Sequence, residues 1–204
     1  MNNMIKEKYA VQANEIVEYS KLAYSMKLVS AAGGNISARC GDRVLITGTN
    51  VPLRNTSHDN LVLCGMDRNV IESPANIKPS KELGLHIGVY KARPEVCYVV
   101  HLHPTFSIIA SLNQKKLHLY TESARLKLKD VPIIPVSAPG SDDLVNKVVS
   151  VVSNTPNDIN AFLMEAHGVL IVGKTMEDCF NQAELLEDSA KIAVFQALMN
   201  PSIK

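Results

Sequence analysis

Two histidines separated by one residue, His101 and His103, follow an apolar and β-branched run at residues 97–100. Because successive side chains of a strand point to opposite faces, both imidazoles share a face, about 6 to 7 Å apart along the chain. That separation suits two ligands of one metal ion, for which Zn–N distances are about 2.0 to 2.1 Å. Pro104 then ends the ladder and can open a helix. The pattern predicts metal ligands at the C-terminal end of a buried strand, a common place for ligands in α/β proteins, or alternatively two packing or surface histidines.

A third histidine, His167, follows a second predicted strand at residues 161–166 and precedes Gly168, which leaves room for a ligand. Three histidines that converge from two strand ends would form an open metal site with one position for substrate, as in catalytic zinc centres. The alternative is that His167 is a strand-end histidine with an ordinary hydrogen-bond partner. Because three imidazoles accept several divalent ions, the pattern does not select zinc over other metals.

The turn at Gly33, Gly34 and Asn35 is the first of two segments that could bind an anion. Adjacent glycines permit positive φ and close approach of the backbone, so the turn could present N–H groups to an anion. It could equally be the end of the preceding helix and a turn into the next strand.

The second segment is residues 78–82, where Pro79 or Ser80 is predicted to begin a helix that runs to about Ala92. Helix N-termini attract phosphate through unpaired N–H groups and the helix dipole. Glu82 in the first turn could act on that dipole alone, unless its carboxylate faces the histidines.

Hydrophobic periodicity predicts the elements that position these residues. Further helices are expected at residues 9–28, 105–112, 142–153 with Ser141 as N-cap, and from Thr175 as N-cap to about Met199. Strands are expected at residues 35–39, 43–47, 60–64, 69–71, 161–166 and 169–173, with an edge strand at 131–135. A loop is expected at residues 113–116, and residues 117–129 receive no assignment. The last helix is expected to present one face made of Cys179, Ala183, Leu186, Ala190, Ala193 and Ala197.

With 204 residues, 46% of them hydrophobic, the chain is expected to form one α/β domain over residues 1–204. Its 21 lysines and arginines nearly balance 20 aspartates and glutamates, so neither a nucleic acid nor a membrane is expected as a partner. The first residues lack a signal-peptide pattern, and no apolar run approaches the ~18 to 20 residues of a membrane span, so a cytoplasmic location is expected. The scattered cysteines predict reduced, buried thiols: Cys40, Cys64, Cys97 and Cys179.

Five motifs occur in one order along the chain: Gly33-Gly34-Asn35-Ile36-Ser37, Thr47-Gly48-Thr49, Pro79-Ser80-Lys81-Glu82, His101-Leu102-His103-Pro104 and His167-Gly168-Val169. This ordered set resembles the class II aldolase/adducin family over about residues 8–198. The resemblance implies an α/β/α sandwich with a central, largely antiparallel sheet. It also implies a C4 homotetramer with active sites at subunit interfaces.

The resemblance also implies roles for individual residues. It implies that His101, His103 and His167 bind a divalent metal, usually Zn²⁺, and that Glu82 lies beside the metal as the catalytic acid/base. The positions where the family binds the substrate phosphate are Gly34, Asn35, Thr49 and Ser80. Tyr120 is similar in placement to a tyrosine that reaches a neighbouring subunit's site and protonates the aldehyde oxygen.

The implied activity is that of a zinc-dependent aldehyde-lyase that cleaves a small phosphorylated keto-sugar, like the family's L-fuculose-phosphate aldolases. Cleavage of a carbon–carbon bond beside a carbonyl leaves an enediolate, which Zn²⁺ stabilises as a Lewis acid. A nearby carboxylate can exchange a proton with the enediolate carbon. No lysine is needed as a Schiff base.

Two positions depart from the aldolase pattern: Asn50 stands where glycine is usual, and Lys81 where a second serine is usual. Lys81 could place a positive charge near a substrate phosphate or carboxylate, or be a solvated helix residue. Ser80-Lys81-Glu82, together with Glu184-x-x-Glu187-x-x-Ala190-Lys191, resembles the family's decarboxylases of 3-oxo-tetronate 4-phosphate, which gives an alternative activity.

Two further branches of the family are less well matched. Glu82 argues against the epimerases, which commonly have aspartate at that position. A catalytically inactive adducin-like scaffold is the alternative from another class of protein, and the complete histidine set argues against it.

Overall fold

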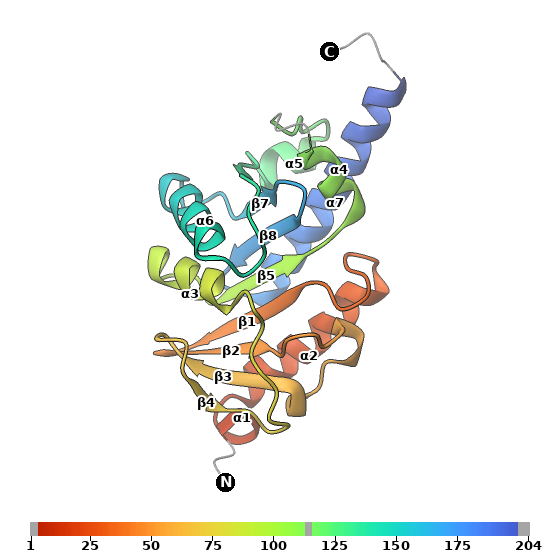
Figure 1. Ribbon diagram of the computed structural model, residues 1–204. Helices are drawn as coiled ribbons and strands as arrows, with labels where there is room; N and C mark the ends of the chain where they lie inside the picture. Colours follow the sequence, from red (N-terminus) through yellow and green to blue (C-terminus); the bar gives the residue numbers. More distant parts are fainter. Residues whose placement is uncertain (1–3, 113–115, 200–204) are drawn as a thin grey trace.

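The computed structural model describes residues 4–112 and 116–199 and is built around one eight-stranded sheet (Figure 1). The strand order is β4-β3-β2-β1-β5-β8-β7-β6, and every neighbouring pair in this sheet is antiparallel except β6 and β7. The strands are β1 (Asn35–Cys40), β2 (Arg43–Thr47), β3 (Leu61–Gly65), β4 (Val70–Glu72), β5 (Tyr98–Leu102), β6 (Ile133–Ile134), β7 (Ala161–Met164) and β8 (Gly168–Gly173). The largely antiparallel sheet is therefore confirmed.

Helices cover both faces of the sheet (Figure 1). One face carries α1 (Met4–Glu7), α2 (Ala10–Ser25), α4 (Thr105–Ser111), α5 (Glu122–Lys127) and α7 (Met176–Met199). The other face carries α3 (Leu83–Ala92) and α6 (Asp142–Asn154). Two short 3-10 helices, Leu53–Asn55 and His58–Asn60, connect β2 to β3. This layering confirms the predicted α/β/α sandwich.

Alternation along the strands divides the interior into two apolar cores, because consecutive side chains face opposite sides of the sheet. In β5, Val100 and Leu102 pack into the core under α2 and α7, whereas Val99 packs into the core under α3 and α6. His101 has the same parity as Val99. The sheet therefore directs His101 to the side on which α3 begins.

The helix expected at the second anion-binding segment begins later than predicted. It starts at Leu83, so the expected start at Pro79 or Ser80 is wrong. Gly48 and Pro79 form an antiparallel bridge, and the N–H of Ser80 donates to the carbonyl of Thr47 at 3.1 Å. Backbone groups used in this pairing hold the segment extended, and the helix begins only after it.

Most other boundaries agree with the expectations to within a few residues. The strand expected at residues 161–166 ends at Met164, because the chain then turns through Ala166 at a φ of 53°. The edge strand expected at residues 131–135 is confirmed as β6, at the end of the sheet. Residues 117–129, which received no assignment, contain α5, and the loop expected at 113–116 lies largely outside the described residues.

Both predicted N-caps are confirmed: Ser141 Oγ accepts the N–H of Leu144, and Thr175 Oγ1 accepts the N–H of Asp178. The predicted apolar face of α7 is buried at its first four positions, but Ala197 at its end is exposed. The last turns of α7 extend past the sheet (Figure 1), so the periodic stripe continues beyond the surface that it covers.

None of the helices in the described ranges is both long and apolar enough to cross a lipid bilayer. All four cysteines are free. Cys40, Cys64 and Cys179 are buried, as expected, whereas Cys97 is half-buried.

Candidate active site

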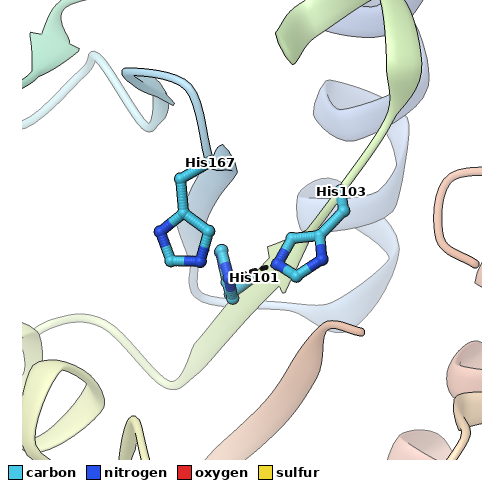
Figure 2. A group of neighbouring side chains, drawn as sticks. All are labelled: His101, His103 and His167. Carbon is cyan, nitrogen blue, oxygen red and sulfur yellow. Dashed lines mark hydrogen bonds between the residues drawn. The ribbon is translucent and has the colours of Figure 1, made fainter. Parts of the chain in front are cut away.

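The three histidines meet at the ends of two central strands, where β5 ends and β8 begins (Figure 2). His101 is the penultimate residue of β5, His103 follows the strand, and His167 lies in the turn that leads into β8. β5 and β8 are antiparallel neighbours with Leu102 opposite Val169, so these two ends coincide. One potential ligand atom of each imidazole lies within 4.8 Å of those of the other two. The structure therefore brings together the predicted ligand set.

The orientation of His101 leaves one ring nitrogen for a metal. Its Nδ1 lies 2.9 Å from the carbonyl oxygen of Val169, which only accepts hydrogen bonds, so Nδ1 carries a hydrogen and Nε2 is the nitrogen left for a proton or a metal ion. That Nε2 lies 2.8 Å from Nε2 of His103 and 3.2 Å from Oε2 of Glu82. Because a carboxylate oxygen lies this close, the arrangement favours positive charge at Nε2, carried by a proton or by a metal ion. Metal-binding histidines commonly direct their second nitrogen to a carbonyl in this way.

Glycines make room for the ligands. A β-carbon at Gly33 would lie 2.5 Å from Nδ1 of His103, and one at Gly168 would lie 2.9 Å from its Cδ2. Gly34, with a φ of 76°, approaches the carbonyl oxygen of His101, from which a β-carbon would be 3.0 Å away. The glycine turn thus packs directly against the ligand strand, in addition to any role toward an anion.

Glu82 is 6% exposed, occupies the N-cap position of α3 and faces the histidines. Its Oε2 accepts a hydrogen bond from Nδ2 of Asn35 at 2.8 Å, and its Oε1 lies 3.6 Å from Nε2 of His167. Within the described ranges Oε1 has no hydrogen-bond partner. From the sequence alone, Glu82 was limited to an interaction with the helix dipole unless its carboxylate faced the histidines. The carboxylate does face them, so a role in the site is open to it.

Burial sets the protonation of the site. Burial, and then the charge of His101, lowers the pKa of His103 to about 3 and that of His167 to about 4. Burial alone would raise the pKa of Glu82, but the charge of His101 and the hydrogen bond from Asn35 outweigh it, so the net shift is downward. At neutral pH the imidazoles of His103 and His167 are neutral, with lone pairs for a metal ion, and Glu82 is a carboxylate.

A cavity of about 340 Å³ opens beside these groups, within the range of small-molecule sites. Its walls include Glu82, His103 and His167. They also include every residue assigned to phosphate binding from the sequence: Gly34, Asn35, Thr49, Ser80 and Lys81. Candidate ligands, carboxylate and phosphate-binding residues therefore share one cavity.

The two hydroxyl residues of this cavity are held by backbone contacts. The N–H of Thr49 donates to the carbonyl of Lys78 at 2.9 Å. The hydroxyl of Thr49 takes no part in this backbone hydrogen bond. Ser80 Oγ accepts the N–H of Glu82 at 3.2 Å and keeps its own hydrogen for a ligand. Lys81 between Ser80 and Glu82 is exposed.

A chain of buried polar side chains behind Glu82 was not predicted from the sequence. Oδ1 of Asn35 lies 2.5 Å from Nε2 of His86, and Nδ1 of His86 lies 2.7 Å from Oγ of Ser37. Ser37 Oγ in turn lies 2.7 Å from the hydroxyl of Tyr90. One signal was present in the sequence, because His86 follows Glu82 by four residues and so shares its helix face.

Tyr120 lies outside this constellation. It is 41% exposed, does not line the cavity, and its carbonyl accepts a hydrogen bond from Arg125. Within one chain the structure does not bring Tyr120 to the histidines, and its contribution to a neighbouring subunit stays a prediction.

Glu187, part of the α7 pattern for which a resemblance to decarboxylases was expected, holds the first turn of α4. Its carboxylate accepts the N–H groups of Phe106 at 2.9 Å and Ser107 at 2.8 Å, together with the Ser107 hydroxyl at 2.7 Å. Because α4 follows His103 after one residue, Glu187 supports the ligand-bearing segment without lining the cavity.

The fold and the site together define a class of protein: an α/β/α sandwich with three convergent histidines at the ends of two central strands and a buried carboxylate beside them. Residues 14–194 match the Class II Aldolase and Adducin N-terminal domain, and the chain belongs to this family. The resemblance stated from the five motifs is thereby confirmed, and relatives in the family are lyases.

The names of two relatives state two different reactions. An L-fuculose phosphate aldolase of Methanocaldococcus jannaschii is 26% identical over 91% of this chain and 97% of its own length. A 3-oxo-tetronate 4-phosphate decarboxylase of Haemophilus influenzae is 30% identical over 89% of this chain and 86% of its own. Family membership therefore leaves the specific activity open.

Solved structures support the fold. YgbL from Klebsiella pneumoniae, 25% identical, superposes with a TM-score of 0.82 over 92% of this chain and 90% of its own. L-fuculose-1-phosphate aldolase from Thermus thermophilus, 21% identical, gives a TM-score of 0.83 over 96% and 98% of the two chains. The sheet and its helical layers are those of class II aldolases.

Proposed function

We propose that the protein is a metal-dependent aldehyde-lyase that cleaves a small phosphorylated keto-sugar, as the relatives named L-fuculose phosphate aldolase do. One observation carries this proposal: the candidate ligands His103 and His167, the carboxylate of Glu82 and the candidate phosphate-binding residues line the same cavity. Carbon–carbon cleavage needs these three functions together. The complete set also argues against an inactive scaffold.

The donor set fits a divalent metal, for which we propose zinc. Three imidazoles with ligand atoms within 4.8 Å match the three protein ligands of catalytic zinc sites, and the Val169 carbonyl orients His101 as such ligands require. When bound, the ion supplies Lewis-acid stabilisation to negative charge that develops beside the substrate carbonyl. Other divalent ions also accept three imidazoles.

Glu82 is the proposed acid/base. It is a carboxylate at neutral pH, and among the described residues its Oε1 accepts no hydrogen bond, although Nε2 of His167 lies 3.6 Å away. Oε1 can therefore take the proton from a substrate carbon in the cavity and return it, a role that typically contributes about 10² to 10⁴-fold to the rate.

The substrate phosphate is proposed to bind at the wall of the cavity formed by Gly34, Asn35, Thr49, Ser80 and Lys81. Thr49 and Ser80 can donate their hydroxyls, and Lys81 supplies a positive charge. The amide atoms of the Asn35 side chain are already bonded to Glu82 and His86, so only the backbone of Asn35 is assigned to the phosphate. Binding this remote group orients the reacting carbon.

A C4 homotetramer with active sites at subunit interfaces is the proposed assembly. Tyr120 is exposed, as a residue that acts in a neighbouring site must be, and is proposed to protonate the aldehyde oxygen there. Apolar side chains are also exposed on α7 and at the end of α4, which is consistent with a contact between copies: Ile109, Leu112, Phe195, Leu198 and Met199.

Decarboxylation of a 3-oxo-tetronate 4-phosphate is the second candidate activity. The 30% identical relative of that name favours it, and so does Lys81, whose ammonium could pair with a substrate carboxylate at the cavity wall. Loss of CO₂ from a β-keto acid and aldol cleavage both leave an enediolate, so the same histidines and Glu82 serve either reaction.

A parallel product assay separates the two activities. The zinc-loaded protein is incubated with phosphorylated ketoses and, separately, with a 3-oxo-tetronate 4-phosphate, while dihydroxyacetone phosphate and CO₂ are measured. An aldolase releases dihydroxyacetone phosphate and an aldehyde from a ketose 1-phosphate without CO₂. A decarboxylase releases CO₂ and dihydroxyacetone phosphate in equal amounts from the 3-oxo-tetronate 4-phosphate and leaves the ketose phosphates intact. Failure to bind stoichiometric metal, with neither product formed, would favour the scaffold.

A further inference from the structure

The buried chain behind Glu82 contains four hydrogen bonds in series. It runs from the Tyr90 hydroxyl through Ser37, His86 and Asn35 to Oε2 of Glu82, with donor–acceptor distances of 2.7, 2.7, 2.5 and 2.8 Å. Ser37 and His86 are fully buried, and Tyr90 is 1% exposed. Polar groups in such a place are retained only when each has a partner, and here each group has one.

The chemistry of the groups fixes the direction of every bond in this chain. An ionised Glu82 can only accept, so Asn35 donates through Nδ2 and must accept through Oδ1. His86 then donates from Nε2, and a neutral ring with its hydrogen there accepts at Nδ1 from the Ser37 hydroxyl. Ser37 oxygen accepts from Tyr90. Burial, and then the charge of His101, lowers the pKa of His86 to about 3, in agreement with the neutral ring.

The chain also makes the two oxygens of Glu82 different. Oε2 is engaged by Asn35 at 2.8 Å and lies 3.2 Å from His101, whereas Oε1 has no hydrogen-bond partner in the described part of the chain. A carboxamide can rotate by 180° about its last bond, which would turn an acceptor toward Oε2 and repel the carboxylate. The hydrogen bond from His86 to Oδ1 opposes that rotation.

We propose that His86 is a positioning residue for the reaction: as the neutral tautomer with its hydrogen on Nε2, it locks the Asn35 carboxamide, which holds Oε2 of Glu82 and leaves Oε1 as the oxygen that exchanges protons with substrate. This inference rests on the proposed acid/base function of Glu82. The His86 side chain neither lines the cavity nor bonds to a candidate metal ligand, and its hydrogen bonds go to Asn35 and Ser37, so its side-chain link to the Glu82 carboxylate runs through Asn35.

Ring ¹⁵N spectra of the zinc-loaded, ¹⁵N-histidine-labelled protein test the tautomer without reference to activity. The His86 signals, assigned by their loss in His86→Gln, are expected to show a protonated Nε2 and an unprotonated Nδ1 at neutral pH. A protonated Nδ1, or an imidazolium, would reverse the direction of the chain and overturn the proposal.

Two substitutions of His86 separate its two nitrogens. In His86→Gln the side-chain amide nitrogen reaches the place of Nε2 and can still donate to Asn35, whereas in His86→Asn only the place of Nδ1 is filled. The readout is exchange of a carbon-bound hydrogen of dihydroxyacetone phosphate with D₂O. We expect His86→Gln to stay within about threefold of the natural protein, and His86→Asn to lose about 10-fold or more in kcat with little change in KM.

The acid limb of the pH profile gives a readout that loss of packing would not move. Without the hydrogen bond from Asn35, the Glu82 carboxylate loses a stabilising donor, so the acid limb is expected to move to higher pH in His86→Asn and to stay in place in His86→Gln. Val89→Ala is the matched control, because Val89 is fully buried in the same helix and outside the chain. An equal kcat loss in Val89→Ala and His86→Asn would assign the effect to helix packing and overturn the proposal.

Glu82→Gln distinguishes failure of this inference from failure of the proposed function. If Glu82→Gln abolishes exchange while His86→Asn matches the natural protein, the role of His86 is wrong and that of Glu82 stands. The proposed function is wrong if Glu82→Gln exchanges normally, or if the natural protein shows no exchange and no product from either substrate class. In either case the inference about His86 is wrong as well.

Discussion

Gly33 lies against the imidazole of His103, so closely that a β-carbon at position 33 would be 2.5 Å from Nδ1 of that ring. The two residues are far apart in the sequence, yet their contact sets how the second candidate ligand is held. The need for glycine at the turn is therefore tied to the candidate metal ligand His103.

Gly33→Ala is expected to displace His103 and to weaken zinc binding by about 10- to 100-fold, as loss of support around a ligand commonly does. Competition with a chelator of known affinity measures the change. Ser30→Ala, an exposed neighbour in the same turn, should bind zinc like the natural protein. Unchanged zinc affinity in Gly33→Ala would show that the ring moves aside at little cost.

His103→Ala removes one of three candidate ligands and should abolish stoichiometric zinc and catalytic activity together. Metal content after gel filtration and the product assay measure these. His58→Ala, at a surface histidine bonded to Asn14, serves as control and should retain both. Full activity in a metal-free preparation would contradict the proposed mechanism.

Glu82→Gln keeps the shape of the side chain but removes the proton acceptor. Zinc content should stay stoichiometric, while exchange of the substrate carbon-bound hydrogen falls by about 100-fold or more. The glutamine oxygen can still accept from Nδ2 of Asn35, but a neutral acceptor makes a weaker hydrogen bond than a carboxylate, so a small loss of stability is expected as well. Exchange at the natural rate would remove Glu82 from its proposed role.

Stability of the metal-free protein should fall as the pH falls from about 7 toward 4. The folded-state pKa of His86 is about 3, because burial opposes its charge, whereas an unfolded histidine titrates near 6.5. Between these values the unfolded chain binds more protons, so acid favours unfolding, by up to about 1.4 kcal/mol per pH unit for one group. His103 and His167 act in the same direction.

The contribution of His86 is isolated by comparison with His86→Gln in urea titrations between pH 7 and pH 4, with a chelator present in all samples. The variant lacks this titration, so its free energy of unfolding should decline less steeply with falling pH. Parallel pH profiles for the two proteins would contradict the buried neutral state of His86.

Arg93 is 2% exposed and donates hydrogen bonds to the carbonyls of Val152, Thr155 and Ile159, which ties the end of α6 to the segment before β7. Arg93→Met removes these donors from the three carbonyls and should lower the free energy of unfolding by about 3 kcal/mol. Urea denaturation measures this. Arg68→Met, which removes an exposed ion pair with Asp142, should cost about 1 kcal/mol or less.

The sequence alone determined the features that depend on neighbours along the chain. Short apolar runs placed β5 and β8, helical periodicity placed α7, and the hydroxyls of Ser141 and Thr175 marked where helices begin. The order of five motifs identified the family and nominated the three histidines and Glu82. These signals are local because they arise from repeats of two to four residues or from short motifs.

Tertiary structure alone decided which distant groups meet. Ser80 is extended because it pairs with Thr47, so its helix begins only at Leu83. Asn35 meets Glu82, 47 positions away, because β1 pairs with β5 in a register that sets Asn35 opposite His101 and beside the start of α3. Strand order and register are settled by the packing of the whole sheet, and no local pattern encodes them.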